Sequence, residues 1–230
     1  MARTRSGEDL INDSYLRADL VGATDRHPRD VVLRYVNQGC AEWYDLIVEA
    51  RGRAYFRATP STITTAASTS RYALPATFYR LISLRVSGSG GYCLDPFSPQ
   101  DEPALREPGV TAAKPTNYEL QPGYVELLPL HAANVSVIVD YVPIFTDLLD
   151  SSTSTFDGIN GWEQYPTEYA AREMLLKDGE KSDAADCTAK LGALAARIAK
   201  LAPKRDAFRA ERVKNVRSGG GSAFPWGRRW

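Results

Sequence analysis

The stretch HPRDVVLRYVNQGCAEWYDL, residues 27–46, decides how the amino-terminal part of this 230-residue chain folds. Its apolar residues recur at steps of three and four, and the series continues to residue 47: Val32, Tyr35, Val36, Cys40, Trp43 and Ile47. Such spacing places them on one face of an α-helix, and a proline such as Pro28 is tolerated in a first helical turn. The sequence therefore predicts an amphipathic helix over residues 28–50.

A shorter helix is predicted before it. Ser6 and Asp9 have the spacing of a capping box, and Leu10, Ile11 and Tyr15 follow near one face. We expect this helix over residues 7–20, with Gly22 ending it.

The carboxy-terminal half predicts a helical hairpin. A helix over residues 161–178 has Pro166 confined to its first turn, and one side carries Trp162, Tyr165, Tyr169 and Leu176. After Gly179 a narrow apolar seam of coiled-coil type runs up to Pro203: Ala184, Cys187, Leu191, Leu194, Ile198 and Leu201. We expect the two helices to pack antiparallel across the short turn.

Between the helical segments the sequence is typical of antiparallel β structure. Short runs rich in Thr, Tyr, Val and Ile alternate with Gly and Pro, and the expected strands are 53–59, 61–66, 71–74, 79–86, 118–120, 124–128 and 135–141. The glycine-rich run at 87–91 leads into another extended segment, which favours a hairpin tip over a phosphate loop. Five prolines make residues 95–115 a loop with at most one helical turn.

Together these elements predict the α+β class, mainly a helical bundle of about four helices with an inserted antiparallel β domain and an extended C-terminal arm. The expected parts are residues 1–51 (amino-terminal helices of the bundle), 52–149 (β-rich insertion), 150–203 (helical hairpin, after a polar linker at 150–155) and 204–230 (arm).

The charge is balanced overall but unevenly distributed. The chain has 28 basic and 28 acidic side chains, so nothing draws the whole protein toward nucleic acid or an acidic membrane. Residues 204–230 contain eight basic and two acidic side chains, a net charge of +6. Residues 1–203 therefore sum to −6.

The cysteine content and the absence of long apolar runs predict a protein made in a reducing cytoplasm. Its cysteines are widely spaced and odd in number: Cys40, Cys93 and Cys187. This argues against a disulfide framework and against a paired-cysteine metal site. No apolar run reaches the ~20 residues of a membrane span, and the first ten residues lack the apolar stretch of a signal peptide. We expect a soluble protein that does not bind a membrane.

Evidence for catalysis is thin in the sequence. Neither His27 nor His131 has a nearby Ser or Cys in a recognisable motif. His27 is expected just before a helix and His131 as a polar turn residue. The carboxylate pairs Asp147/Asp150 and Asp183/Asp186 more often cap helices or stay solvated than bind a metal. We expect no enzymatic activity, no cofactor and no metal.

The order of motifs along the chain carries a family resemblance. HPRDVVLRYVNQGCAEWYDL is followed by RYALPATFYRLISLRV, by YELQPGYVELLP and VSVIVDYVP, and by FDGINGWEQYPTEYAAREMLLKDGEKSD. Over residues 26–215 this succession resembles the head-to-tail adaptor (connector, or head completion) proteins of tailed bacteriophages.

The resemblance implies a structural virion protein in the neck, between capsid portal and tail. Copies of the chain, expected to number twelve, would form a ring under the portal, extend the DNA channel and offer a docking platform to tail or nozzle proteins. Genomic DNA would pass through the lumen without specific binding. The nearest alternative is a tail-side completion or terminator protein, which would not contact the portal.

The basic arm can be interpreted in three ways: as a solvated disordered end, as a nonspecific DNA-binding segment, or as a segment that docks on the portal. We favour portal docking because three large aromatic side chains in the last seven residues exceed what phosphate attraction requires. The candidate portal-binding residues are Phe208, Arg212, Val213, Val216, Arg217, Phe224, Trp226, Arg228, Arg229 and Trp230. The candidate subunit-interface residues, which could equally be core residues, are Trp162, Tyr165 and Tyr169.

Overall fold

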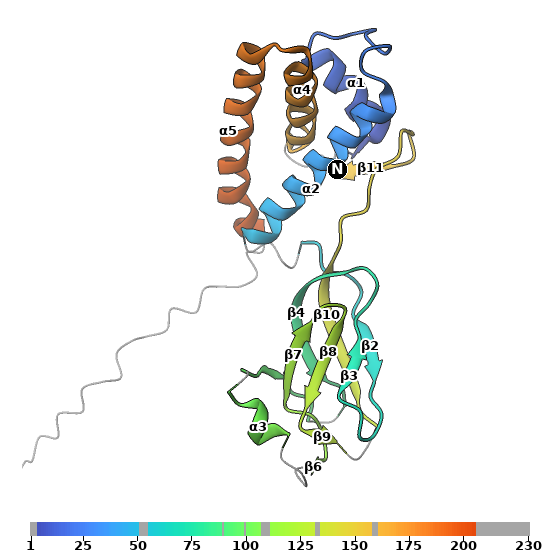
Figure 1. Ribbon diagram of the computed structural model, residues 1–230, viewed down its shortest axis with the longest axis vertical. Helices are drawn as coiled ribbons and strands as arrows, with labels where there is room; N and C mark the ends of the chain where they lie inside the picture. Colours follow the sequence, from blue (N-terminus) through green and yellow to red (C-terminus); the bar gives the residue numbers. More distant parts are fainter. Residues whose placement is uncertain are drawn as a thin grey trace, which may run out of the picture.

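The computed structural model describes residues 4–50, 55–88, 90–98, 100–106, 111–131, 134–157 and 161–205 and has an α+β fold, which confirms the predicted class (Figure 1). The helices are α1 (Gly7–Arg17), α2 (Arg29–Glu49), α3 (Glu102–Leu105), α4 (Gln164–Asp178) and α5 (Lys181–Arg205). The strands are β1 (Thr4–Ser6), β2 (Ser61–Thr64), β3 (Arg71–Ala73), β4 (Phe78–Val86), β5 (Asp95–Pro96), β6 (Thr111–Ala112), β7 (Asn117–Gln121), β8 (Tyr124–Leu128), β9 (Leu130–His131), β10 (Ser136–Pro143) and β11 (Thr155–Asp157).

Helices α1, α2, α4 and α5 share one hydrophobic cluster, and we call residues 4–50 and 155–205 the helical unit. The predicted apolar face of α2 is confirmed, since Val36, Cys40 and Trp43 are buried. Helices α2 and α4 approach closely at Gly39, where a Cβ atom would lie 2.9 Å from the Cα of Pro166. A residue without a side chain is therefore needed at this crossing.

The ends of the helices follow from local sequence. The predicted capping box opens α1, because the Ser6 hydroxyl accepts a hydrogen bond from the Asp9 N–H (3.0 Å) and the Asp9 carboxylate accepts one from the Ser6 N–H (3.2 Å). Between α4 and α5, Gly179 adopts φ +83°, a left-handed conformation that suits glycine at a helix end. The predicted hairpin of two helices is thus present.

The seam predicted for α5 is also present. Ala184, Cys187, Leu191 and Ile198 are buried against the rest of the helical unit, and Leu194 and Leu201 are half-buried. Helix α5 continues two residues past Pro203, where the sequence predicted its end. On α4 the prediction for Leu176 is wrong: it is exposed, and Met174 and Leu175 are buried in its place because α4 packs against α1, α2 and α5 on several sides.

The β-rich part, residues 61–143, is called the β unit and contains a second hydrophobic cluster. One sheet has the strand order β3-β8-β7-β5 and the other β2-β10-β4. Leu84, Val125 and Val139 are buried between them. Strands β7 and β8 form an antiparallel hairpin around Gly123, whose φ of +77° suits the tight turn. Two short parallel pairings, β5 with β7 and β6 with β9, were not predicted.

Aromatic side chains join the two units. The Tyr44 ring on α2 lies against the Tyr79 ring on β4 with ring centroids 6.3 Å apart, and the Tyr44 hydroxyl donates to the Pro143 carbonyl (2.6 Å). The Tyr79 hydroxyl on β4 donates to the Asp45 carboxylate (2.7 Å). The two units therefore meet through packed and hydrogen-bonded side chains as well as through the connecting chain.

Other boundaries also differ from the sequence predictions. The strand expected at 53–59 is absent from its described residues, 55–59, because Tyr55 and Phe56 pack against the helical cluster. Helix α1 ends at Arg17, not at residue 20. The expected linker at 150–155 leads directly into β11, which pairs antiparallel with β1. Within 95–115, α3 is the single helical turn that the prolines allowed.

Candidate interaction surfaces

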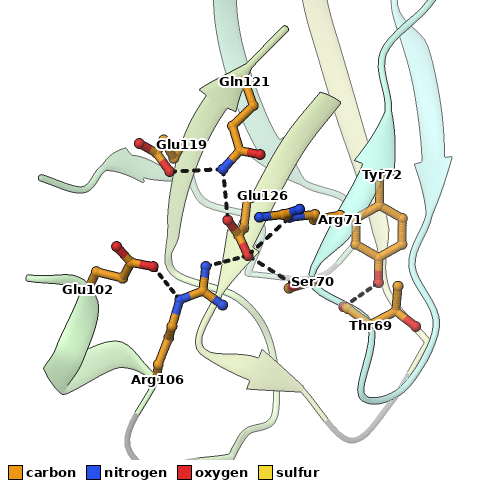
Figure 2. Close-up of polar contacts among 9 residues, drawn as sticks. All are labelled: Thr69, Ser70, Arg71, Tyr72, Glu102, Arg106, Glu119, Gln121 and Glu126. Carbon is orange, nitrogen blue, oxygen red and sulfur yellow. Dashed lines mark hydrogen bonds and ion pairs between the residues drawn. The ribbon is translucent and has the colours of Figure 1, made fainter. Parts of the chain in front are cut away.

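A buried carboxylate organises one face of the β unit (Figure 2). The Glu126 side chain on β8 is 1% exposed. Its Oε1 accepts hydrogen bonds from Arg106 (2.6 Å) and from the Ser70 hydroxyl (3.1 Å). Its Oε2 accepts from the Gln121 amide (3.1 Å), and the Arg71 guanidinium lies 3.8 Å from Oε1. Both oxygens thus have partners, as a buried charge requires.

Arg106 links this network to the loop that carries α3. It donates to Glu126 and also to Glu102 (2.6 Å) at the start of α3. We expect Arg106→Ala to lower the free energy of unfolding by about 1–3 kcal/mol, because the Glu126 carboxylate then stays buried with one strong donor fewer. Urea unfolding monitored by circular dichroism measures this loss.

The control for that prediction is Arg34→Ala. Arg34 forms an exposed ion pair with Asp30 on one helix (3.2 Å), a kind of contact worth about 0.5 kcal/mol or less. Equal losses in the two variants would contradict a stabilising role for the Glu126 network.

A second buried carboxylate lies on the other sheet. The Asp140 side chain on β10 is 5% exposed and accepts hydrogen bonds from Arg57 (2.7 Å) and Ser83 (3.0 Å), with Arg85 3.6 Å away. Burial raises the pKa of this carboxyl, but the hydrogen bonds and the two arginines outweigh burial and hold the pKa below its ordinary value. Asp140 is therefore ionised at neutral pH and anchors two half-exposed guanidinium groups.

The two histidines are buried and hydrogen-bonded. His27, just before α2 as expected, places Nε2 3.0 Å from the Asp178 carboxylate at the end of α4. His131 was predicted as a polar turn residue, and this is wrong: it lies in β9, is 1% exposed, and its Nε2 is 2.7 Å from the Thr65 hydroxyl. Burial lowers the pKa of His131. Both side chains connect segments that are far apart in the sequence.

Two of the three candidate subunit-interface residues are buried in the core of the helical unit. Trp162 is 1% exposed and packs edge-on against Trp43, with centroids 6.0 Å apart. Tyr165 is also buried, and its hydroxyl donates to Glu42 (3.2 Å); burial, together with this carboxylate, raises the pKa of Tyr165 to about 12. Tyr169 is half-buried beneath the Arg172 guanidinium, 4.4 Å from the ring centroid. Tyr169 thus has the most exposed ring of the three.

The candidate portal-binding residues lie outside the described residues, which end at Arg205. Their role stays a prediction from the sequence. Among the described residues, no helix is long and apolar enough to cross a membrane. The same part of the chain contains no group of three or more His, Cys, Asp or Glu side chains that could hold a metal ion.

A groove of about 770 Å³ lies between α1, α4 and α5, and the sequence did not reveal it. Its wall includes Glu168, whose side chain is 9% exposed. Oε1 of this carboxylate pairs with Arg17 (2.5 Å), whereas Oε2 is buried and has no hydrogen-bond partner within the described chain. Burial and the neighbouring Glu168 raise the pKa of the Cys187 thiol, which therefore remains a weak neutral donor beside the carboxylate.

The other groove residues provide charges of both signs and an apolar rim. Arg5 pairs with Asp13 across the wall (3.5 Å), and Lys190 lines the α5 side. Leu16 lines the groove from α1 and is 64% exposed. The groove therefore combines an incompletely satisfied buried carboxylate, balanced charges and exposed apolar surface.

Comparison with known proteins agrees with the resemblance found in the sequence. No curated protein matches the chain. The SU10 adaptor protein family matches residues 6–217, which covers the β unit and nearly all of the helical unit and leaves residues 1–5 and 218–230 outside the match. This confirms the expected relation to phage head-to-tail adaptors, and the chain belongs to the SU10 adaptor protein family.

Proposed function

We propose that this protein is a structural adaptor in the neck of a tailed-phage virion and has no enzymatic activity. The observation that carries the proposal is the family match over residues 6–217, which spans nearly the whole described fold. In this proposal the helical unit is the four-helix bundle of the adaptor body. Copies of the chain, expected to number twelve, form a ring under the portal, and the ring offers a docking platform to tail proteins.

The arm, residues 204–230, attaches the ring to the portal in this proposal. Its net charge of +6 and its three terminal aromatic residues support a role in docking. Burial of each aromatic side chain contributes roughly 2 kcal/mol, so one arm binds with modest affinity. A ring presents many arms at once, so the binding of one arm raises the effective concentration of the others at the portal. The modest affinity of each arm then adds up to lasting attachment of the ring.

The body charge supports a passive DNA channel. Residues 1–203 carry a net charge of −6, so we expect a neutral or acidic lumen through which DNA slides without binding. The protein would be made in the cytoplasm of the bacterial host and end in the virion. A ring structure with a strongly basic lumen would contradict this part of the proposal.

The test compares three forms of the protein: the full chain, a form ending at Arg217 and a form ending at Arg205. The last keeps α5 to its final described residue, and the second keeps the part of the arm that the family match covers. Native mass spectrometry of each form, alone and with the portal protein of the same phage, measures ring formation and attachment.

We expect a portal-bound ring with the full chain and none with the form ending at Arg205. The form ending at Arg217 separates the two halves of the arm: loss of binding there assigns attachment to the terminal aromatic residues. Full portal binding by the shortest form would contradict arm docking. If no form joins the portal, the protein is a tail-side or DNA-binding protein, and affinity for DNA that falls steeply with salt would identify the latter.

A further inference from the structure

The groove between α1, α4 and α5 contains a buried acceptor that has no hydrogen-bond partner within the described chain. The free Oε2 of Glu168 is a buried charged acceptor, and such groups in folded proteins are normally matched by a donor. The Cys187 thiol donates to this carboxylate, but a thiol is a weak donor. An ammonium or guanidinium group brought by a partner would be a stronger donor to Oε2.

The charges of the groove favour a protein occupant. Its wall contains four basic and three acidic side chains, so the charges there are nearly balanced: Arg5, Arg17, Lys190 and Arg197 against Asp13, Glu163 and Glu168. Nucleic acid would need an excess of positive charge to neutralise its phosphates. The exposed side chain of Leu16 at the rim instead suits an apolar protein surface.

Helix α5 has an exposed surface of small residues on the side that does not line the groove, and we call it the outer face of α5. Its residues repeat at steps of four and three along the helix, and all of them are exposed: Ala185, Ala189, Gly192, Ala196 and Ala199. This is the spacing of a helix–helix seam, and small side chains let a second backbone approach closely. A Cβ atom at Gly192 would meet nothing within 4 Å, so this chain's own packing does not require glycine there.

We propose that the outer face of α5 in one copy of this chain packs into the groove of the next copy. The inference rests on the ring of the proposed function and assigns the surfaces that build it. Groove and outer face are different surfaces on two flanks of one helix, and such head-to-tail contacts generate rings. In this contact Lys181 or Lys200, both exposed beside the outer face, supplies an ammonium donor to Glu168 Oε2.

The size of this surface indicates a weak contact between two copies. At 1.5 Å per residue the 25 residues of α5 extend about 37 Å, and a strip about 10 Å wide has an area of about 370 Å². Stable interfaces bury about 800 Å² on each partner. Two free copies should therefore meet only transiently, and a covalent trap is the appropriate measurement.

The experiment uses the full chain with Cys93→Ser, which removes the exposed thiol and leaves the buried Cys40 and Cys187. Leu16→Cys marks the groove and Ala189→Cys marks the outer face; both positions are exposed, so folding should be unaffected. Each single variant and the double variant are treated with a short bis-maleimide at high protein concentration and separated on a denaturing gel.

A head-to-tail contact predicts a ladder of dimers, trimers and higher species from the double variant and only monomer from either single variant. Gly192→Leu added to the double variant should reduce the ladder at least tenfold, because a bulky side chain keeps the helices apart. Arg34→Leu, an apolar substitution at an exposed position of α2 outside both the groove and the outer face, should leave the ladder unchanged.

Other results would overturn the inference. Dimers from Ala189→Cys alone would indicate a symmetric contact, and a ladder insensitive to Gly192→Leu would indicate another surface. Loss of the ladder when residues 206–230 are removed would make the arm the occupant. If no ladder forms but the same double variant still joins the portal as a ring, the inference fails and the proposed function stands; if neither forms, both fail.

Discussion

Gly39→Ala should destabilise the protein even though alanine is the better helix former. In the interior of α2 the substitution would ordinarily stabilise by about 1 kcal/mol. Here the new Cβ would lie 2.8 Å from the Tyr169 Cβ and 2.9 Å from the Pro166 Cα, and neither atom is the end of a flexible side chain. Helices α2 and α4 would have to separate, so we expect a net loss of about 1–3 kcal/mol, and about 3 kcal/mol or more for Gly39→Leu.

Gly192→Ala is the matched control for this prediction. It is also a glycine within a helix, but a Cβ atom there meets open space. We expect a gain of about 0.5–1 kcal/mol in the free energy of unfolding, measured by urea denaturation of both variants side by side. Changes of the same sign at the two positions would mean that helix propensity, and not the α2–α4 contact, determines the effect at Gly39.

Trp43→Ala should cause the other large loss of stability. Trp43 is 2% exposed, and its ring centroid lies 4.5 Å from that of Phe156, 5.6 Å from Phe56 and 6.0 Å from Trp162. Removal of the indole leaves a cavity among rings from three separate segments. We expect the free energy of unfolding to fall by about 3–5 kcal/mol.

Thermal unfolding followed by near-ultraviolet circular dichroism measures this loss, because the signal reports aromatic packing. Trp43→Phe is the control: it keeps an aromatic ring at the centre of the cluster and should lose much less than Trp43→Ala. A loss of less than about 1 kcal/mol for Trp43→Ala would show that the neighbouring rings close the cavity at little cost.

The helices could be predicted because their signals are local. The apolar spacing from Val32 to Ile47, the Ser6–Asp9 capping box and Gly179 each act within a few residues of the structure they determine. The error at Leu176 has a different origin. Helix α4 is covered on several sides, so no single apolar stripe marks its buried face.

The features that the sequence did not reveal join residues that are distant along the chain. Strand β1 consists of three residues, too few for a strand pattern, and its strand partner β11 lies about 150 residues later in the chain. The sequence around Glu126 predicts an ordinary exposed charged residue. Its buried network exists only in the folded chain, where Arg106 and Ser70 lie beside it. The groove around Glu168 likewise needs three helices in place, so local patterns could not predict it.

The division of the chain between the two units has a consequence for its synthesis on the ribosome. The β unit is continuous in sequence, so it is complete as soon as Pro143 has emerged. The apolar face of α2 must wait for α4, whose first residue, Gln164, follows Glu49 by 115 residues. At about 5–20 residues per second this interval is roughly 6–23 s, during which the nascent chain exposes Trp43 and its neighbours to chaperones.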